Sequence, residues 1–339
     1  MKRNTTFLMS LLVLLQTFLL SGCGRNATDD IVVTVSSTDD EDFAFYDYFM
    51  VEKTVEIPDS GQYLLSSVRD LFLADNFLYV LDDAKTLSKI DLTKGEIVEQ
   101  ELQVGRGPQD YLMPINITAD KERLYLLDYM AKYVHVYDLD LNHLDKFSVE
   151  SLDSPSSFLK VKDGFMFLNS FESDSIGQFV MTDDRGFKKT SFLKAGEESG
   201  GDDDEFSDIG EIQFRVIYTD NYFYPESSGS LNCYSPATNV MYRFDGKRLT
   251  RLYQLQYDKP QNSYGSIMKV FPINGNTLVC YLLNGVDRFA YYDKDLKLVA
   301  DGKGMGERPF FQIWQQGSRL IRVIDSGESV RVEIFKQTN

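Results

Sequence analysis

The chain has 339 residues, of which 43% are hydrophobic and 26% charged, and its 52 acidic against 35 basic residues give a net charge of −17. This composition excludes a disordered chain and a polytopic membrane protein, and the acidic balance excludes a nucleic-acid-binding protein, which needs a basic surface. Two histidines leave almost nothing for a histidine-rich metal site, and 24 Phe and 20 Tyr against a single Trp favour strands over helices.

Residues 1–22 have the features of a secretory signal peptide. Lys2-Arg3 precede an apolar run from Phe7 to Leu20 that is too short and too interrupted for a transmembrane helix. The run leads into Leu20-Ser21-Gly22-Cys23, which resembles the bacterial lipobox, in which the cysteine is acylated and becomes the first mature residue. The alternatives are an uncleaved N-terminal anchor or a chance cysteine near an ordinary signal.

The lipobox resemblance implies lipidation at Cys23, with the membrane as a partner through the acyl chains. Gly24 stands where an aspartate would retain a lipoprotein at the inner membrane, so the resemblance implies the outer membrane, with the periplasmic or the surface side left open. After Cys23, the stretches GRNATDD and SSTDDED are small, polar and acidic without periodicity, which predicts that residues 23–50 form a flexible tether.

From residue 51 to the end, the apolar residues alternate with period two between Gly, Asn, Asp and Pro, as in a series of short strands. Six similar strand-like runs begin at residues 77, 123, 164, 221, 276 and 318, which are 46, 41, 57, 55 and 42 residues apart. A repeat in the forties with several strands in each unit is typical of β-propeller blades.

A second marker is a tight hairpin with Asp, Asn or Gly at its tip, which follows the first marker five times and would join the third and fourth strands of a blade. The sixth unit ends the chain without a hairpin, and its missing strand is available in MVEKTVEI, from Met50 to Ile57. The sequence therefore predicts an all-β fold: a six-bladed β-propeller over residues 51–339, closed by the N-terminal strand in the last blade.

The loop VGRGPQDY and the strands on either side of it resemble the six-bladed β-propeller lipoproteins that are numerous in Gram-negative gut bacteria. Gly105, Gly107, Pro108 and Tyr111 match the Gly-x-Gly-Pro-Gly-Glu-Tyr-like loop of that family, while Gln109-Asp110 stand where Gly and Glu are common. The resemblance covers the chain from about Val51 onward and implies the propeller fold. The family is defined by its shape and implies no general activity.

Catalytic motifs are absent from the sequence. His135 alternates with tyrosines in a strand and His143 lies at a hairpin tip, so both are expected to be structural, and no nucleophile elbow, P-loop or H-E-x-x-H motif occurs. We predict no catalytic residue, no metal ligand and no cofactor, although calcium at the turn Asp138–Asn142 stays open. The acidic loop at residues 200–205 is expected to be solvated charge.

Two cysteines follow Cys23, and the compartment permits a disulfide between them. Cys280 lies in an apolar strand pattern and Cys233 near a loop, so unpaired, partly buried thiols are favoured over a bridge.

The site hypothesis concerns two glycine-rich loops that lead into inner strands. Arg106 and Tyr111 lie in one and Arg308 in the other, and we expect all three to border one funnel mouth that receives a peptide or a small anionic group. The predicted function is a lipid-anchored binding or scaffold module at the outer membrane, for a protein or peptide. The alternative is a hydrolase or lyase of the lactonase-like propeller type, with a metal on the axis.

Overall fold

The computed structural model describes residues 31–36, 41–58, 65–170, 176–194, 222–258, 265–304, 312–325 and 329–338. The chain divides into two units, residues 1–32 and 33–339, and only Ile31 and Val32 of the first are described. The signal peptide, Cys23, the acidic loop at 200–205 and Arg308 thus lie outside the described residues. Within the described ranges, no helix has the length and apolar character that a membrane span requires.

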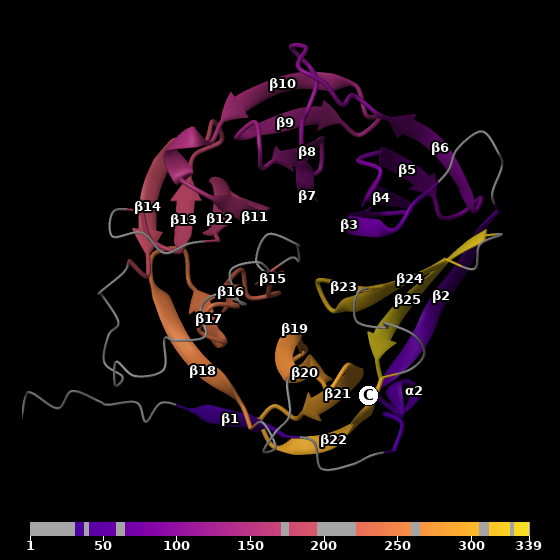
Figure 1. Cartoon of the computed structure of the whole chain (residues 1–339), viewed down its shortest axis with the longest axis vertical. Helices are drawn as coiled ribbons and strands as arrows, with labels where there is room; N and C mark the ends of the chain where they lie inside the picture. The colour runs from indigo at the N-terminus through magenta and orange to yellow at the C-terminus, as the bar shows by residue number, and fades with distance from the viewer. Residues whose placement is uncertain are drawn as a thin grey trace, which may run out of the picture. The chain divides into compact units, whose positions relative to one another are not determined.

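Six antiparallel sheets make up the second unit, and Figure 1 views them down their common axis. In each blade an inner strand lies nearest the axis and the strands after it step outward in sequence order; in the fourth and sixth blades a strand from the N-terminal end of the chain lies outermost. This arrangement confirms the predicted six-bladed β-propeller. The strands of the first three blades are β3 (Val68–Ala74), β4 (Phe77–Asp82), β5 (Leu87–Asp91), β6 (Glu96–Glu101); β7 (Pro114–Ala119), β8 (Arg123–Asp128), β9 (Tyr133–Asp138), β10 (His143–Ser148); and β11 (Pro155–Val161), β12 (Gly164–Asn169), β13 (Phe179–Thr182), β14 (Lys188–Phe192).

A short 3-10 helix, η1 (Glu150–Leu152), joins the second and third blades. The last three blades follow the same plan as the first three, except that a strand from the N-terminal end of the chain is added to the fourth blade and another to the sixth. The strands are β15 (Phe223–Pro225), β16 (Leu231–Ser235), β17 (Val240–Phe244), β18 (Leu249–Tyr257); β19 (Gly265–Ile273), β20 (Asn276–Leu283), β21 (Val286–Tyr292), β22 (Leu298–Lys303); and β23 (Ile313–Gln316), β24 (Arg319–Asp325), β25 (Ser329–Gln337).

Ring closure occurs as the sequence predicts. Strand β2 (Phe49–Pro58) pairs antiparallel with β25 as the outermost strand of the sixth blade, with Val51 opposite Phe335 and Ile57 opposite Val330. The pairing joins the two ends of the propeller chain in one sheet, so that β25 does not present an unpaired edge. Arg319 adds a bidentate ion pair with Glu52 on the surface of this blade.

The five hairpins between third and fourth strands share one local device. Each begins with an aspartate whose carboxylate accepts hydrogen bonds from backbone N–H groups two to four residues later, which satisfies the donors of a tight turn. At the turn where calcium was left open, the Asp138 carboxylate accepts bonds from the N–H of Asp140 and from both the N–H and the side chain of Asn142. These five aspartates are Asp91, Asp138, Asp183, Asp245 and Asp293.

The six repeated runs do not all take the same place in their blades. Five of the six repeated runs are second strands, but the fourth, which begins at Asn221, forms the innermost strand β15, and the second strand of that blade is β16. Apolar alternation is the same for a first and a second strand, since both lie between neighbouring blades. Only the irregular spacings of 57 and 55 residues on either side indicated the shift.

The described part of the expected tether is packed structure, not a flexible linker. Strand β1 (Val32–Val35) adds a fifth strand to the fourth blade beside β18, and the Asp258 N–H donates to the Val35 carbonyl. Further on, Lys303 of β22 exchanges backbone hydrogen bonds with Glu41 and Phe43. We call residues 33–36 and 41–49 the strap, because they follow the outer edges of the fourth and fifth blades before the chain enters β2.

Aromatic side chains hold the strap in place. Phe43, Phe45 and Phe49 are fully or almost fully buried. The single helical turn α2 (Phe45–Tyr48) begins at Phe45 and ends just before Phe49. The Phe45 ring is 5.2 Å from Phe335 and 6.0 Å from Phe289, measured between centroids, so it links the fifth and sixth blades. The sequence analysis missed this role because acidic residues surround these apolar ones and hide any periodicity.

Gly302 allows the close approach of the strap to β22. A Cβ atom at this position would lie 2.7 Å from the Phe43 nitrogen and 2.8 Å from the Glu41 carbonyl oxygen, both backbone atoms that cannot move aside alone. Any larger residue at position 302 would therefore separate the strap from the fifth blade.

Both remaining cysteines are buried thiols that form no disulfide, Cys233 in β16 and Cys280 in β20.

Candidate functional site

The carboxylate of Asp110, a residue of the loop itself, stabilises the glycine-rich loop between β6 and β7. Asp110 accepts a 2.7 Å hydrogen bond from the Gly107 N–H, and Gly105 donates to the Tyr111 carbonyl. A side chain at Gly105 would clash with Asp110, because a Cβ there would lie 2.2 Å from its carboxylate oxygen. Arg106 is exposed at the tip of the loop.

Tyr111 is not available at a funnel mouth. It has no exposed surface, its hydroxyl donates to the Lys85 carbonyl over 2.8 Å and it accepts from the Gln103 N–H. Burial raises the pKa of this hydroxyl to about 12. The structure thus gives Tyr111 a structural role between the first and second blades. The proposed meeting of Arg106 and Arg308 stays a prediction, since Arg308 lies outside the described residues.

Around the axis, side chains join the inner strands of neighbouring blades. The Asp70 carboxylate on β3 accepts from the Asn116 side chain and from the Ile117 N–H on β7, at 2.5 and 2.7 Å. The Asn116 amide oxygen in turn accepts from the Phe158 N–H on β11 at 2.9 Å. On the other side, Lys269 of β19 donates to the Ile313 carbonyl of β23 at 3.0 Å.

Asp70, Asn116, Ser157 and Lys269 occupy the same place in their blades. Each directly follows a register shift near the start of its inner strand, and each is buried, with at most 5% of its surface exposed. The sequence analysis missed this polar ring, although a polar residue inside an otherwise apolar inner strand was a visible signal. Three of its members hold the blades together, which accounts for buried charge so near the axis.

A cavity of about 170 Å³ lies at the other end of the inner strands. Five inner strands contribute to it, mostly with residues at their carboxyl ends. The cavity therefore opens on the face that carries the first hairpins, by which we mean the turns between the first and second strands of each blade. The loop with Arg106 leads into the start of β7, whereas Ala119, the residue of β7 that lines the cavity, is the last residue of that strand. The Arg106 loop and the cavity thus lie at opposite ends of β7. The axial cavity is lined by Leu71, Phe72, Ala119, Leu159, Lys160, Phe223, Tyr224, Pro225, Trp314, Gln315, Gln316 and Gly317.

The axial cavity has aromatic and amide walls and one ammonium group. Among the described lining residues, only Lys160 is charged, and its Nζ is 3.1 Å from the Asp184 carboxylate and donates to the Val161 carbonyl. Gln316 exchanges two hydrogen bonds with the Leu73 backbone, which fixes its amide across the junction of β23 and β3. Within the described residues, no group of three or more His, Cys, Asp or Glu side chains could hold a metal.

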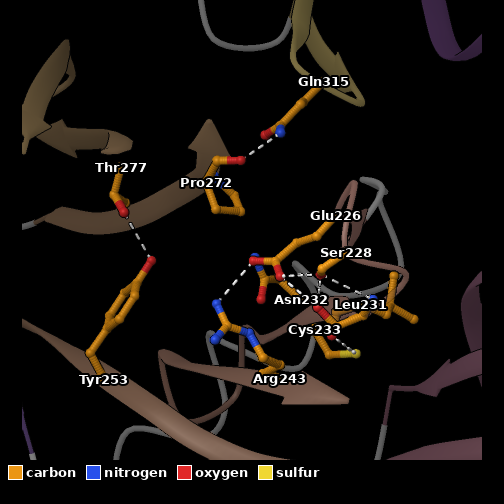
Figure 2. Close-up of polar contacts among 11 residues, drawn as sticks. Glu226, Ser228, Leu231, Asn232, Cys233, Arg243, Tyr253, Pro272, Thr277 and Gln315 are labelled. Atoms are coloured by element: carbon orange, nitrogen blue, oxygen red, sulfur yellow. Dashed lines mark hydrogen bonds and ion pairs between the residues drawn. The ribbon is translucent and has the colours of Figure 1, made fainter. Parts of the chain in front are cut away.

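The turn beside the cavity is fixed by a carboxylate with several donors. Figure 2 shows Glu226, which follows the cavity residue Pro225, with Asn232 and Arg243 donating to one of its oxygens at 2.9 and 3.0 Å. Ser230 donates to the other oxygen. Although partial burial opposes it, the hydrogen bonds from Ser230 and Asn232 and the charge of Arg243 lower the pKa of Glu226. This network positions the end of β15 at the cavity rim.

Figure 2 also shows how Gln315 reaches β19. Its side-chain nitrogen donates to the Pro272 carbonyl at 2.7 Å and to the Gly317 carbonyl at 2.8 Å. The cavity wall at β23 is therefore held from both sides, by Gln315 toward the fifth blade and by Gln316 toward the first.

The only two histidines of the chain form a pair in the second blade, away from the axial cavity. His135 Nδ1 and His143 Nε2 are 3.3 Å apart, and the His135 ring has no exposed surface. Burial, together with the neighbouring His143 and Lys146, lowers the pKa of His135 to about 4. His135 is thus uncharged at neutral pH.

The histidine pair predicts a stability that falls in acid. Because the unfolded chain binds a proton at His135 with a pKa near 6.5 and the folded chain with a pKa of about 4, the unfolded state holds more protons between these values. The free energy of unfolding should fall by about 3 kcal/mol at most as the pH drops from 6.5 to 4. Urea unfolding of wild type and His135→Leu at pH 7.5 and 4.5 measures this.

The variant should show a clearly smaller decrease than the wild type. Carboxylates contribute to acid destabilisation in both proteins, so only the difference between the two decreases reports His135. An equal decrease would contradict the prediction.

Comparisons with known proteins support the fold. The family model DUF5128, described as a 6-bladed beta-propeller, matches residues 24–294. A protein of Bacteroides fragilis, provisionally described as exported, superposes with a TM-score of 0.65 at 15% identity, over 91% of this chain and 99% of that one. A member of the DUF4221 family from Bacteroides vulgatus has a TM-score of 0.56 at 11% identity, over 86% and 98%. No curated protein matches the sequence.

Proposed function

Because the chain belongs to the six-bladed β-propeller family DUF5128, we propose that it is a lipid-anchored binding or scaffold module of the outer membrane, for a protein or peptide partner. The observation that carries the binding role is the axial cavity. Five blades enclose it, its walls are apolar and aromatic with a few amides, and its one lining cation is engaged by Asp184. Such walls suit an uncharged group inserted from a larger partner.

The volume of the cavity favours a partner over a small metabolite. Pockets that enclose whole small ligands measure roughly 300–1,000 Å³, whereas this one measures about 170 Å³. That volume corresponds to about five water molecules, which suits one inserted side chain. The remaining affinity would come from the face around the mouth, where the first hairpins lie.

The cavity carries its own reporter, because Trp314 is the only tryptophan of the chain and lines the cavity. Pools of synthetic hexapeptides, each with one fixed central residue, should include some that shift the Trp314 emission. Ala119→Leu should weaken that binding at least about tenfold, since it fills the cavity at the end of β7. Because Ala119 also contacts the core, Phe72→Ala serves as a second variant that changes the cavity by removing volume.

Leu298→Ala is the matched control, since Leu298 is 41% exposed on the outer strand β22. Peptide binding that is equal in wild type, Ala119→Leu and Phe72→Ala would place the site elsewhere. The absence of any binding pool would contradict the peptide-binding proposal.

The anchoring part of the proposal concerns Cys23. The signal-like residues 1–22 and the lipobox-like cysteine support it, and a structural neighbour provisionally described as exported is compatible with an envelope location. Cys23→Ser should move the protein from the membrane fraction to the soluble fraction, because acyl chains would be its membrane contact. Fractionation with a carbonate wash tests this, with Cys233→Ser as the control. A Cys23→Ser protein that stays in the washed membranes would contradict lipid anchoring.

A further inference from the structure

The outer strand of the first blade runs into an extended segment whose outward edge is unpaired. β6 is the outermost strand of this blade, and no strand in the described ranges pairs with its outer side (Figure 1). Past its end, the Gln103 N–H donates to the Tyr111 hydroxyl and the Gln103 carbonyl accepts from the Tyr111 N–H, so Gln103 bonds toward the buried side. Because successive residues of an extended chain direct their backbone groups to opposite edges, the N–H and C=O groups of Leu102 and Val104 face outward.

The side chains at this edge are apolar and exposed. Leu102 is 60% exposed and Val104 47%, and both line a groove of about 450 Å³. The other lining residues, which do not include Arg106, are Gln103, Pro108, Gln109 and Asp110. Charged side chains usually protect a free edge from pairing with another strand, as Lys188 and Lys189 do on β14, the outermost strand of the third blade. An edge that carries exposed Leu and Val instead is suited to receive a strand.

The opposite face of the same segment is acidic. Glu99 and Glu101 alternate with Gln100 and Leu102, so they lie on the other side of the chain from the apolar pair. Burial and the charge of Glu99 raise the pKa of Glu101, although a hydrogen bond with Gln103 opposes this, and no described lysine or arginine contributes. A positively charged partner at this face would relieve the repulsion between the two carboxylates.

From these two faces we propose that the edge binds an extended peptide of a partner as an added strand, in which basic and apolar side chains alternate. Its backbone groups pair with those of Leu102 and Val104. Its apolar side chains pack on Leu102, Val104 and Pro108, and its basic side chains lie over Glu99 and Glu101. The net charge of −17 also favours the approach of a cationic segment. No described residue lines both this groove and the axial cavity, so the site is separate from that of the proposed function.

A cationic strand peptide tests the proposal. Fluorescein-Gly-Lys-Val-Lys-Val-Lys-Val-amide is titrated against the protein, and fluorescence anisotropy measures binding. Wild type should bind it at least about tenfold more tightly than the versions in which Ser replaces Val or Glu replaces Lys, since the first lacks the apolar face and the second repels the carboxylates. A version N-methylated at every lysine and valine lacks the N–H donors of an added strand, and it should bind at least about tenfold more weakly.

Substitutions on the apolar face test the packing. Leu102→Ser combined with Val104→Ser should weaken binding of the Lys-Val peptide at least about tenfold, because both side chains lose their apolar contact with the added strand. Leu144→Ser is the matched control, since Leu144 is 53% exposed on β10, the outermost strand of the second blade. Its binding should equal that of wild type.

Substitutions on the acidic face test the charge. Glu99→Gln combined with Glu101→Gln should weaken binding about fivefold, as two partly exposed ion pairs predict. Glu122→Gln combined with Glu150→Gln is the matched control, because it removes the same charge from exposed positions elsewhere in the chain. That control should bind within about twofold of wild type, since salt screens distant charges.

Amide hydrogen exchange locates the bound peptide. Exchange in residues 98–105 should slow when the Lys-Val peptide is bound, because the outward N–H groups of Leu102 and Val104 gain partners. The Ala119→Leu variant, which fills the axial cavity, should bind the peptide as wild type does.

Several results would overturn the proposal. The Lys-Val peptide does not bind, the N-methylated version binds equally well, or the two pairs of Glu substitutions weaken binding equally while the Ser substitutions have no effect, which indicates diffuse electrostatic attraction. Loss of binding in Ala119→Leu would place the peptide in the axial cavity, which overturns the added strand while supporting the proposed function.

Discussion

Deletion of residues 50–57 should abolish cooperative unfolding of the propeller. The deletion removes nearly all of β2, which pairs with β25 along its whole length, and it exposes the hydrogen-bonding edge of β25. It also removes Val55 and Ile57, which are buried between the sixth and first blades. We expect aggregation, or a fall in melting temperature of at least about 10 °C, since a loss of several kcal/mol lowers the melting temperature of a large domain by that much.

Circular dichroism melts and light scattering measure this effect. Glu52→Ala is the control, because it removes only the surface ion pair with Arg319 while leaving β2 in place. Its effect should not exceed about 1 kcal/mol. A deletion variant that keeps the wild-type melting temperature would mean that pairing of β2 with β25 contributes little to the stability of the ring.

Phe45→Ala should destabilise the protein by about 3–5 kcal/mol, the usual range for removing a fully buried phenylalanine. Phe45 is 1% exposed, and its ring contacts Phe49 at 4.8 Å, Phe335 at 5.2 Å and Phe289 at 6.0 Å between centroids. The substitution leaves a cavity where the strap meets the last two blades. Urea unfolding measures the change in free energy.

The neighbouring tyrosine provides a matched control. Tyr46 is 52% exposed. Its ring centroid nevertheless lies 6.2 Å from that of Phe335, close to the 6.0 Å between Phe45 and Phe289. Tyr46→Ala should destabilise by about 1 kcal/mol or less, because little apolar area leaves water when this side chain packs. Equal effects of the two substitutions would contradict a structural role of the strap and support the flexible tether that the sequence predicts.

Much of the fold could be read from the sequence because its signals are local. Alternating apolar residues determine which stretches become strands, and an aspartate at the start of each third-to-fourth-strand turn satisfies the donors of that turn within five residues. Six repeats with only five such hairpins left one strand missing, and the stretch Met50–Ile57 offered a strand at the other end of the chain. Counting the strand repeats against the hairpins thus predicted the pairing of β2 with β25, which lie near opposite ends of the chain.

Other features depend on which residues meet in three dimensions. Tyr111 matches a family loop motif, but only the tertiary structure shows that its hydroxyl is hydrogen-bonded to the Lys85 carbonyl and to the Gln103 N–H. The strap residues Phe43 and Phe45 are scattered among acidic residues. Their burial depends on Phe289, 246 residues after Phe43, and on Phe335, 290 residues after Phe45. Sequence periodicity carries no information about such distant partners.

The axial cavity is the clearest case of a site that the sequence could not locate. Its walls come from five strands that are far apart in the sequence, and most of the lining residues are apolar, as in any buried strand. The sequence alone determined the repeat, the strand pattern and the closure of the ring, because those depend on neighbours along the chain. The tertiary structure decided which end of the axis is hollow and which residues line the cavity there, because both depend on how separate blades converge.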